Sequence, residues 1–188
     1  SKCTVQSLRS QMGIMMQDSF IFSGTVRSNI AYGKLDAADE EIRRAAKIVQ
    51  ADRFIEQMPK GYQTEIKEKG GSLSQGEKQL LSFARTIVSD PKILILDEAT
   101  SSIDTKTEQA LQEGIEQMLK GRTSFIIAHR LSTIMNADRI LVVSHGRIIE
   151  HGTHAELIAL RGAYYHLFTQ QFRADEPLIP SYSRTLLS

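Results

Sequence analysis

Two adjacent carboxylates, Asp97 and Glu98, directly follow the aliphatic run Ile93–Leu96. Such a run predicts a strand over about 92–97 that is buried on both faces of a parallel sheet. Because α/β proteins bind ligands at the edge where these strands end, one carboxylate there can bind Mg²⁺ or its water while the other polarises an attacking water. The same pattern also fits a strand end with two solvated acids, so the pair alone leaves the chemistry open.

A second candidate site lies in the segment Leu73-Ser74-Gln75-Gly76-Glu77. A serine hydroxyl, a glycine that lets the backbone approach, and the amides of a helix N-terminus together make a site for an anion. Glu77, three residues after Ser74, also completes an ordinary capping box that needs no ligand. Both interpretations begin a helix at Ser74.

Further polar residues follow other apolar segments. His129 comes directly after 124–128, and by itself it fits a structural hydrogen-bonding residue. Gln17 follows Gly13–Met16 and by itself is a polar strand end. The sequence contains no G-x-x-x-x-G-K-[ST], the glycine-rich loop that cradles phosphates.

The elements that must position these residues follow from the spacing of apolar side chains. Asp36 is the expected N-cap of one helix, and Pro59 ends the helical pattern after Phe54. We expect helices at about 25–32, 37–50, 74–88, 105–119, 131–136 and 154–172, and strands at about 11–16, 92–97, 124–128 and 139–144.

The order of these elements predicts the fold class. Strands and helices alternate after Pro91, which favours an α/β core with a parallel sheet, and the stretch 24–89 is mostly helical. We therefore expect one domain over 1–172, with a helical subdomain at about 24–89 and an α/β core at 90–172. Residues 173–188 are expected to form a flexible tail.

The composition excludes several classes of protein. The formal charge is +1, from 23 basic and 22 acidic residues, which gives no electrostatic case for binding nucleic acid. The single cysteine excludes an internal disulfide and fits a reducing compartment. No apolar run approaches the roughly 20 residues that span a bilayer.

Taken together and in this order, the motifs resemble the nucleotide-binding domain of ATP-binding cassette (ABC) transporters over nearly the whole chain. The resemblance implies a P-loop NTPase-like α/β core without its P-loop strand, and a helical subdomain that carries the signature motif. The stretches 20–30 and 128–134 are similar to the exporter branch, which includes multidrug and lipid exporters.

The resemblance also implies roles for single residues. Gln17 resembles the glutamine that contacts Mg²⁺ and senses the γ-phosphate, and Asp97 the Mg²⁺ ligand of Walker B. Glu98 resembles the catalytic base, and His129 the switch histidine that holds the γ-phosphate and the attacking water. The signature and D-loop, which contact nucleotide, are implied for Leu73, Ser74, Gln75, Gly76, Glu77, Ser102 and Asp104. The signature reads Leu-Ser-Gln-Gly-Glu rather than the commoner Leu-Ser-Gly-Gly-Gln, and both phosphate-facing positions are kept.

Partners and cofactors follow from the same resemblance. ATP and Mg²⁺ are the implied cofactors, and a second nucleotide-binding domain, in a homo- or heterodimer, is the implied partner, paired head to tail. The helical subdomain is expected to meet the cytoplasmic loops of a transmembrane domain. That domain, absent from this chain, would hold it at the cytoplasmic face of the cell membrane. No nucleic-acid partner is expected.

The missing phosphate cradle predicts an N-terminally truncated ATPase. We expect ATP hydrolysis by the full-length protein, and neither turnover nor high stability in the isolated chain. One alternative is a non-hydrolytic module that lends Ser74 and Gly76 to a partner's ATP, which the intact Glu98 and His129 disfavour. Another is a soluble ABC-type ATPase that acts on DNA or ribosomes, which the near-neutral charge disfavours.

Overall fold

The structure is a computed structural model that describes residues 4–16, 20–67, 70–97, 105–128 and 135–175. The chain divides into two compact units, Ser1–His129 and Arg130–Ser188, and each is described by itself. Among the helices of the described ranges, none has the length and apolar character to cross a membrane. The predicted domain boundaries at 24, 89 and 172 remain predictions.

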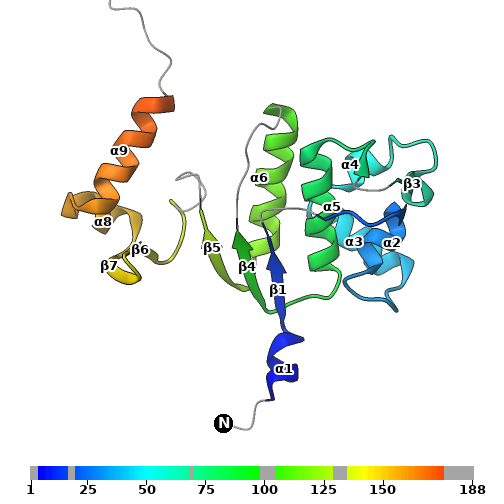
Figure 1. The fold of residues 1–188 in the computed structure, drawn as a ribbon, viewed down its shortest axis with the longest axis horizontal. Helices are drawn as coiled ribbons and strands as arrows, with labels where there is room; N and C mark the ends of the chain where they lie inside the picture. Colours follow the sequence, from blue (N-terminus) through cyan, green and yellow to red (C-terminus); the bar gives the residue numbers. More distant parts are fainter. Residues whose placement is uncertain (1–3, 17–19, 68–69, 98–104, 129–134, 176–188) are drawn as a thin grey trace, which may run out of the picture. The chain divides into compact units, whose positions relative to one another are not determined.

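A three-stranded parallel sheet forms the centre of the first unit (Figure 1). Its strands are β1 (Met12–Met15), β4 (Ile93–Asp97) and β5 (Thr123–Ile127), in the order β1-β4-β5. Gly13 pairs with Leu94, and Leu94 pairs with Ser124. The α/β class with a parallel core is therefore confirmed.

Within the described residues of the first unit, helices cover one face of this sheet. Leu94 and Leu96 are 0% and 3% exposed, and they share a hydrophobic core with residues of the helices. On the opposite face Ile14, Phe125 and Ile127 are each more than half exposed. The prediction that the β4 strand is buried on both faces is wrong, because the described residues of this unit supply a helical layer to one face alone.

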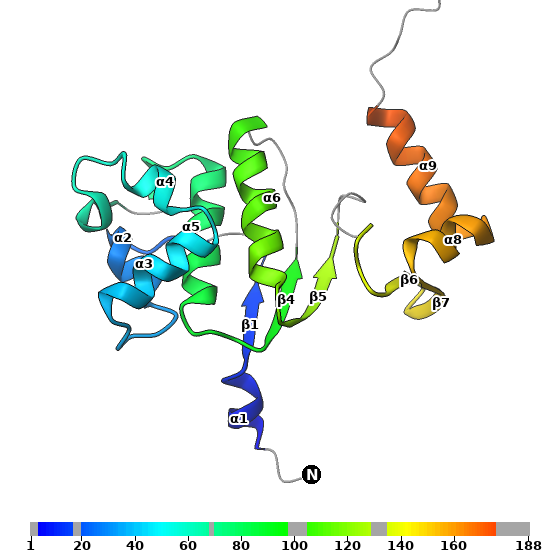
Figure 2. The same ribbon diagram turned by 180° about the vertical axis from the view of Figure 1, so that it is seen from behind.

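The helix α5 (Gln75–Ile87) links the sheet to the rest of the unit. It contacts α2, α3 and α6 as well as β1, and its neighbours are seen from both sides in Figures 1 and 2. The stretch 24–89 is mainly helical, as expected, with one small antiparallel pair, β2–β3. The other elements of the unit are α1 (Val5–Arg9), β2 (Gly24–Thr25), α2 (Val26–Ala31), α3 (Asp39–Ile48), α4 (Asp52–Ile55), a 3₁₀ turn (Gly61–Gln63), β3 (Glu65–Ile66) and α6 (Thr105–Leu119).

The start of α3 differs from the prediction. Its N-cap is Ala38 rather than Asp36, because the Glu41 carboxylate reaches back and accepts a hydrogen bond from the Ala38 amide at 2.9 Å. The same carboxylate contacts the Lys34 ammonium at 2.6 Å. Gln50 adopts a left-handed conformation, with φ of 62°, and separates α3 from α4.

The second unit is a hairpin followed by two helices. Its elements are β6 (Ile140–Ser144), β7 (Arg147–Gly152), α8 (His154–Leu160) and α9 (Ala163–Asp175). The single helix predicted for 154–172 is therefore two helices, because Arg161 turns into the left-handed region at φ 53°. The Glu150 carboxylate accepts hydrogen bonds from the amides of Ala163 and Tyr164 at the start of α9. The helix predicted at 131–136 and the tail beyond 175 lie outside the described residues.

Candidate functional site

The N-terminus of α5 has the geometry of a capping box. The Glu77 amide donates to the Ser74 hydroxyl oxygen at 3.2 Å, and the Ser74 amide donates to the Glu77 carboxylate at 2.8 Å. The cap uses Ser74 Oγ as an acceptor only, so its O–H proton stays available to an anion. The structural and the anion-binding interpretations of this segment are therefore compatible.

The backbone at the start of α5 adds two further donors. Gln75 and Gly76 occupy the first two helical positions, where amides have no acceptor within the helix. Ser74 and Gln75 are exposed, whereas Leu73 is 7% exposed and anchors the preceding turn in the core. The Glu77 carboxylate occupies the Ser74 amide and Gly76 is buried, so an anion here would first meet the Ser74 hydroxyl and the Gln75 amide.

Asp97 lies at the carboxyl end of β4, and its side chain is half-buried. Strand register places it beside Ile127 and on the same face as Ile14, Ile95 and Phe125. A carboxylate therefore stands at the end of the uncovered face. Among the described residues, no group of three or more His, Cys, Asp or Glu side chains is placed to hold a metal ion.

Five predicted site residues lie outside the described residues: Gln17, Glu98, Ser102, Asp104 and His129. Three of them follow closely on the described ends of neighbouring strands. β1 ends at Met15, β4 at Asp97 and β5 at Ile127, and parallel strands end at one edge of a sheet. Gln17, Glu98 and His129 therefore each follow, in sequence, a strand that ends at the same sheet edge.

A polar network around Asn29 and Arg85 was not among the features predicted from the sequence. Asn29 lies in α2, is 1% exposed, and exchanges hydrogen bonds of 2.9 Å with both the amide and the carbonyl of Phe22. Its side chain also donates to the Thr25 carbonyl at 3.1 Å. The available signal was an asparagine on the same helix as Val26 and Ile30, since a buried amide requires hydrogen-bond partners.

Arg85, near the end of α5, completes this network. Its guanidinium donates to the Phe20 carbonyl at 2.7 Å and to the Asn29 carbonyl and side-chain oxygen at 2.9 Å each. It also lies 4.9 Å from the Phe22 ring centre and 5.9 Å from that of Tyr32. Burial lowers the pKa of the Arg85 guanidinium, which nonetheless stays protonated at neutral pH. No carboxylate in the described part of the chain forms an ion pair with it.

Above this cation lies a surface that we call the aromatic patch, made of Phe20, Phe22 and Tyr32. The rings of Phe20 and Phe22 meet edge to face at 4.9 Å, and those of Phe22 and Tyr32 lie 4.3 Å apart. Phe20 and Tyr32 are 62% and 57% exposed. An exposed cluster of aromatic rings in mutual contact is typical of a contact site for another protein segment.

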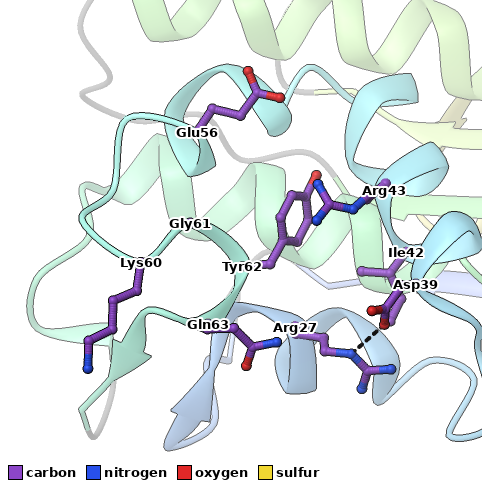
Figure 3. Close-up of a pocket in the computed structure, with 9 residues that line it drawn as sticks. All are labelled: Arg27, Asp39, Ile42, Arg43, Glu56, Lys60, Gly61, Tyr62 and Gln63. Carbon is purple, nitrogen blue, oxygen red and sulfur yellow. Dashed lines mark hydrogen bonds and ion pairs between the residues drawn. The ribbon is translucent and has the colours of Figure 1, made fainter.

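A separate pocket of about 320 Å³ lies in the helical part of the first unit (Figure 3). The Arg43 guanidinium lies 4.7 Å from the Tyr62 ring centre, and Arg27 forms an ion pair with Asp39 at 2.7 Å. Burial raises the pKa of the Tyr62 hydroxyl. None of the site residues predicted from the sequence lines this pocket, so it is distinct from the start of α5.

The chain is similar to several known proteins. It is 53% identical, over 86% of its length, to a fatty acid ABC transporter ATP-binding/permease protein of Mycobacterium bovis. It is 49% identical, over 89% of its length, to an ATP-dependent lipid A-core flippase of Desulfotalea psychrophila. The structure of a bacterial Atm1-family ABC exporter with ATP bound matches 88% of the chain at 44% identity, with a TM-score of 0.80.

The chain spans 26% and 29% of the length of these two relatives, and 29% of the exporter chain. Residues 1–101, more than half of the 188, match the ABC transporter family. This match agrees with the order of motifs, the parallel sheet and the capped start of α5. The chain therefore belongs to the ABC transporter family.

Proposed function

We propose that this chain is part of the ATP-binding and ATP-hydrolysing component of an ABC exporter, in which turnover powers the export of a substrate across a membrane. The main support for this proposal is the geometry of Ser74, whose hydroxyl oxygen caps α5 and whose proton stays free for a phosphate. The names of the similar exporters support the direction of transport.

The proposed cis residues are Asp97, Glu98, Gln17 and His129. Catalysis of phosphoryl transfer is largely positioning and charge stabilisation, and the shared sheet edge of β1, β4 and β5 supports a common location for these groups. Glu98 acts as the base toward water, and His129 and Gln17 contact the γ-phosphate. The oxygen donors of Asp97 and Gln17 fit Mg²⁺, which neutralises phosphate charge when it is bound.

The proposed trans residues act on ATP held by a second nucleotide-binding domain. Ser74 and the amides of Gln75 and Gly76 contact its phosphates, with Leu73 and Glu77 shaping the turn. Ser102 and Asp104 complete this surface. The exposure of Ser74 and Gln75 supports a site that is open to a partner. The full protein is then a dimer of such domains, each ATP lying between them.

The aromatic patch is the proposed contact for cytoplasmic loops of a transmembrane domain. Exposed rings on the mainly helical stretch 24–89 and the segment just before it support this placement. Through this contact the domain would sit at the cytoplasmic face of the cell membrane. The near-zero net charge supports the absence of a nucleic-acid partner.

We further propose that the isolated chain neither hydrolyses ATP nor folds with high stability. Its sequence has no P-loop motif to grip the triphosphate, and Ile14, Phe125 and Ile127 leave an apolar sheet face in water. Light scattering during heating should show aggregation of the isolated chain. A cooperative, reversible melt of a monomer would contradict this expectation.

The decisive experiment measures ATP turnover by the full-length protein. Glu98→Gln should abolish turnover, whereas Glu113→Gln, which alters only an exposed ion pair with Arg53, should leave it unchanged. Turnover that survives Glu98→Gln would refute the assigned base. Steady turnover by the 188-residue chain alone, lost in Glu98→Gln, would refute its inactivity.

A second candidate is the non-hydrolytic module that only donates Ser74 and Gly76. The formed cap at Ser74, in a sequence without a P-loop motif, is the observation that favours it. Addition of the chain to a P-loop-bearing partner domain distinguishes the two. Rescue of turnover that is insensitive to Glu98→Gln in this chain would favour the donor role.

A further inference from the structure

We propose that Arg85 is a positioning residue that fastens the Phe20–Thr25 segment to α5, so that the aromatic patch and the start of α5 move as one body. The inference rests on the proposed function where it treats the patch as a docking surface and Ser74 as a phosphate contact. It adds a residue that belongs to neither of these surfaces and joins them.

The guanidinium of Arg85 holds two chain segments at once. One Nη donates to the Phe20 carbonyl, ahead of α2, while Nε and the other Nη donate to the carbonyl and side-chain oxygens of Asn29, within α2. All three acceptors are neutral oxygens. A planar fork can satisfy three such acceptors in fixed directions, which a lysine ammonium cannot reproduce.

Asn29 extends the fastening to the rest of the segment. Its side-chain oxygen accepts from both the Phe22 amide and Arg85, and its side-chain nitrogen donates to the carbonyls of Phe22 and Thr25. Because Asn29 is 1% exposed, water cannot replace these partners. Release of Arg85 therefore loosens Phe22 as well as Phe20.

The body that Arg85 completes extends along α5 to Ser74. The two residues are eleven positions apart on one helix, or about 16 Å at 1.5 Å per residue. Gly33, which follows Tyr32, packs directly on the Arg85 carbonyl, so the backbone after α2 also has no room to slide past α5. Movement of the patch is thus transmitted to the first turn of α5.

Arg85 is half-buried and, among the described residues, has no carboxylate partner, so its partly desolvated charge is a poor source of stability alone. An apolar residue of similar volume would fill this space without the desolvation of a charge. What the guanidinium supplies, and an apolar residue would not, is a directional link between the segment and the helix. We therefore predict that loss of the Arg85 guanidinium loosens the Phe20–Thr25 segment and leaves the rest of the first unit unchanged.

The test is amide hydrogen exchange at single-residue resolution in the full-length protein, comparing Arg85→Lys with the unmodified form. Without nucleotide, we expect exchange of the Phe22 amide to be about tenfold or more faster in Arg85→Lys, with exchange across α3 unchanged. Arg122→Lys is the matched control and should leave Phe22 unchanged. Arg122 also donates to two carbonyls and one side-chain oxygen, those of Pro91, Met118 and Asp90.

A non-hydrolysable ATP analogue then tests the transmission. In the unmodified protein, exchange should slow at the amides of both Glu77 and Phe22, and in Arg85→Lys it should slow at Glu77 alone. Equal acceleration at α3 and Phe22 without nucleotide, or unchanged exchange at Phe22, overturns the inference, as does nucleotide-dependent slowing at Phe22 in Arg85→Lys. No slowing at Glu77 in the unmodified protein counts against the proposed function, and the nucleotide-free comparison still decides the role of Arg85.

Discussion

Ser74 has two tasks in our interpretation, and two substitutions separate them. Its oxygen caps α5 by accepting from the Glu77 amide, and in the proposed function its proton is donated to a partner's phosphate. Ser74→Ala removes both contributions. Ser74→Asp keeps a capping oxygen, because aspartate and serine are equally good N-caps, but places a negative charge where the phosphate would lie.

The two substitutions should differ in how much they change the free energy of unfolding and the affinity for phosphate. Loss of the cap in Ser74→Ala should lower the free energy of unfolding by about 1 kcal/mol. In Ser74→Asp the favourable charge at the helix N-terminus and the repulsion from Glu77 are each a few tenths of a kcal/mol, so stability should change by less than about 0.5 kcal/mol. The same charge about 4 Å from a phosphate costs roughly 4 kcal/mol at a surface-like dielectric, which is two to three powers of ten in affinity.

Two assays on the full-length protein are needed, urea unfolding and ATP turnover. Thr153→Ala is the matched control, because Thr153 and Glu156 form the same capping box at the start of α8. It should lower the free energy of unfolding about as much as Ser74→Ala and leave turnover unchanged. Ser74→Asp should show the opposite pattern.

Wild-type turnover in Ser74→Asp would refute the phosphate contact. An unchanged free energy of unfolding in Ser74→Ala would refute the cap. If Ser74→Asp lost stability and turnover together, the separation of the two tasks would itself be wrong.

Two further predictions concern stability. A methyl group at Gly33 would overlap the Arg85 carbonyl oxygen, so Gly33→Ala should lower the free energy of unfolding by about 3 kcal/mol, measured by urea denaturation; a loss below about 1 kcal/mol would contradict the close packing. The Lys92 ammonium at 3.1 Å and the Arg122 guanidinium at 2.9 Å lower the pKa of the Asp90 carboxyl. The Asp90 carboxylate therefore stabilises the folded protein fully above its unfolded pKa of about 3.9, and this contribution is lost as the pH falls through the lower folded pKa. The difference in unfolding midpoint between the full-length protein and its Asp90→Asn variant should therefore be constant from pH 7 to about pH 5 and shrink below about pH 4. A constant difference down to pH 2 would contradict this assignment.

Local features of the fold could be predicted from the sequence. Ser74 and Glu77 are three residues apart, and a capping box depends on nothing more distant, so the start of α5 was expected and is found. The aliphatic run before Asp97 likewise predicts a parallel strand, which is found, because apolar content and length decide that assignment, but it did not show that one face of the strand lies open.

Features that depend on distant residues could not be predicted. Arg85 and Asn29 are 56 positions apart, and neither residue type alone indicates a partner. The N-cap of α3 is Ala38 because the Glu41 side chain bonds its amide, whereas Asp36 is the residue type that the sequence favours as N-cap. The break at Arg161 required a non-glycine residue in a left-handed conformation, which the helical spacing around it does not signal.

The placement of Asp97 on the uncovered sheet face couples assembly to electrostatics. Whatever segment packs on Ile14, Phe125 and Ile127 will also take this carboxylate out of water. The apolar contacts favour such packing, whereas an unpaired buried charge opposes it by several kcal/mol. A cation that binds Asp97 removes this energetic cost. Packing on the uncovered face and cation binding at Asp97 therefore favour each other. We therefore expect the uncovered face to be packed most tightly when a cation is bound at Asp97.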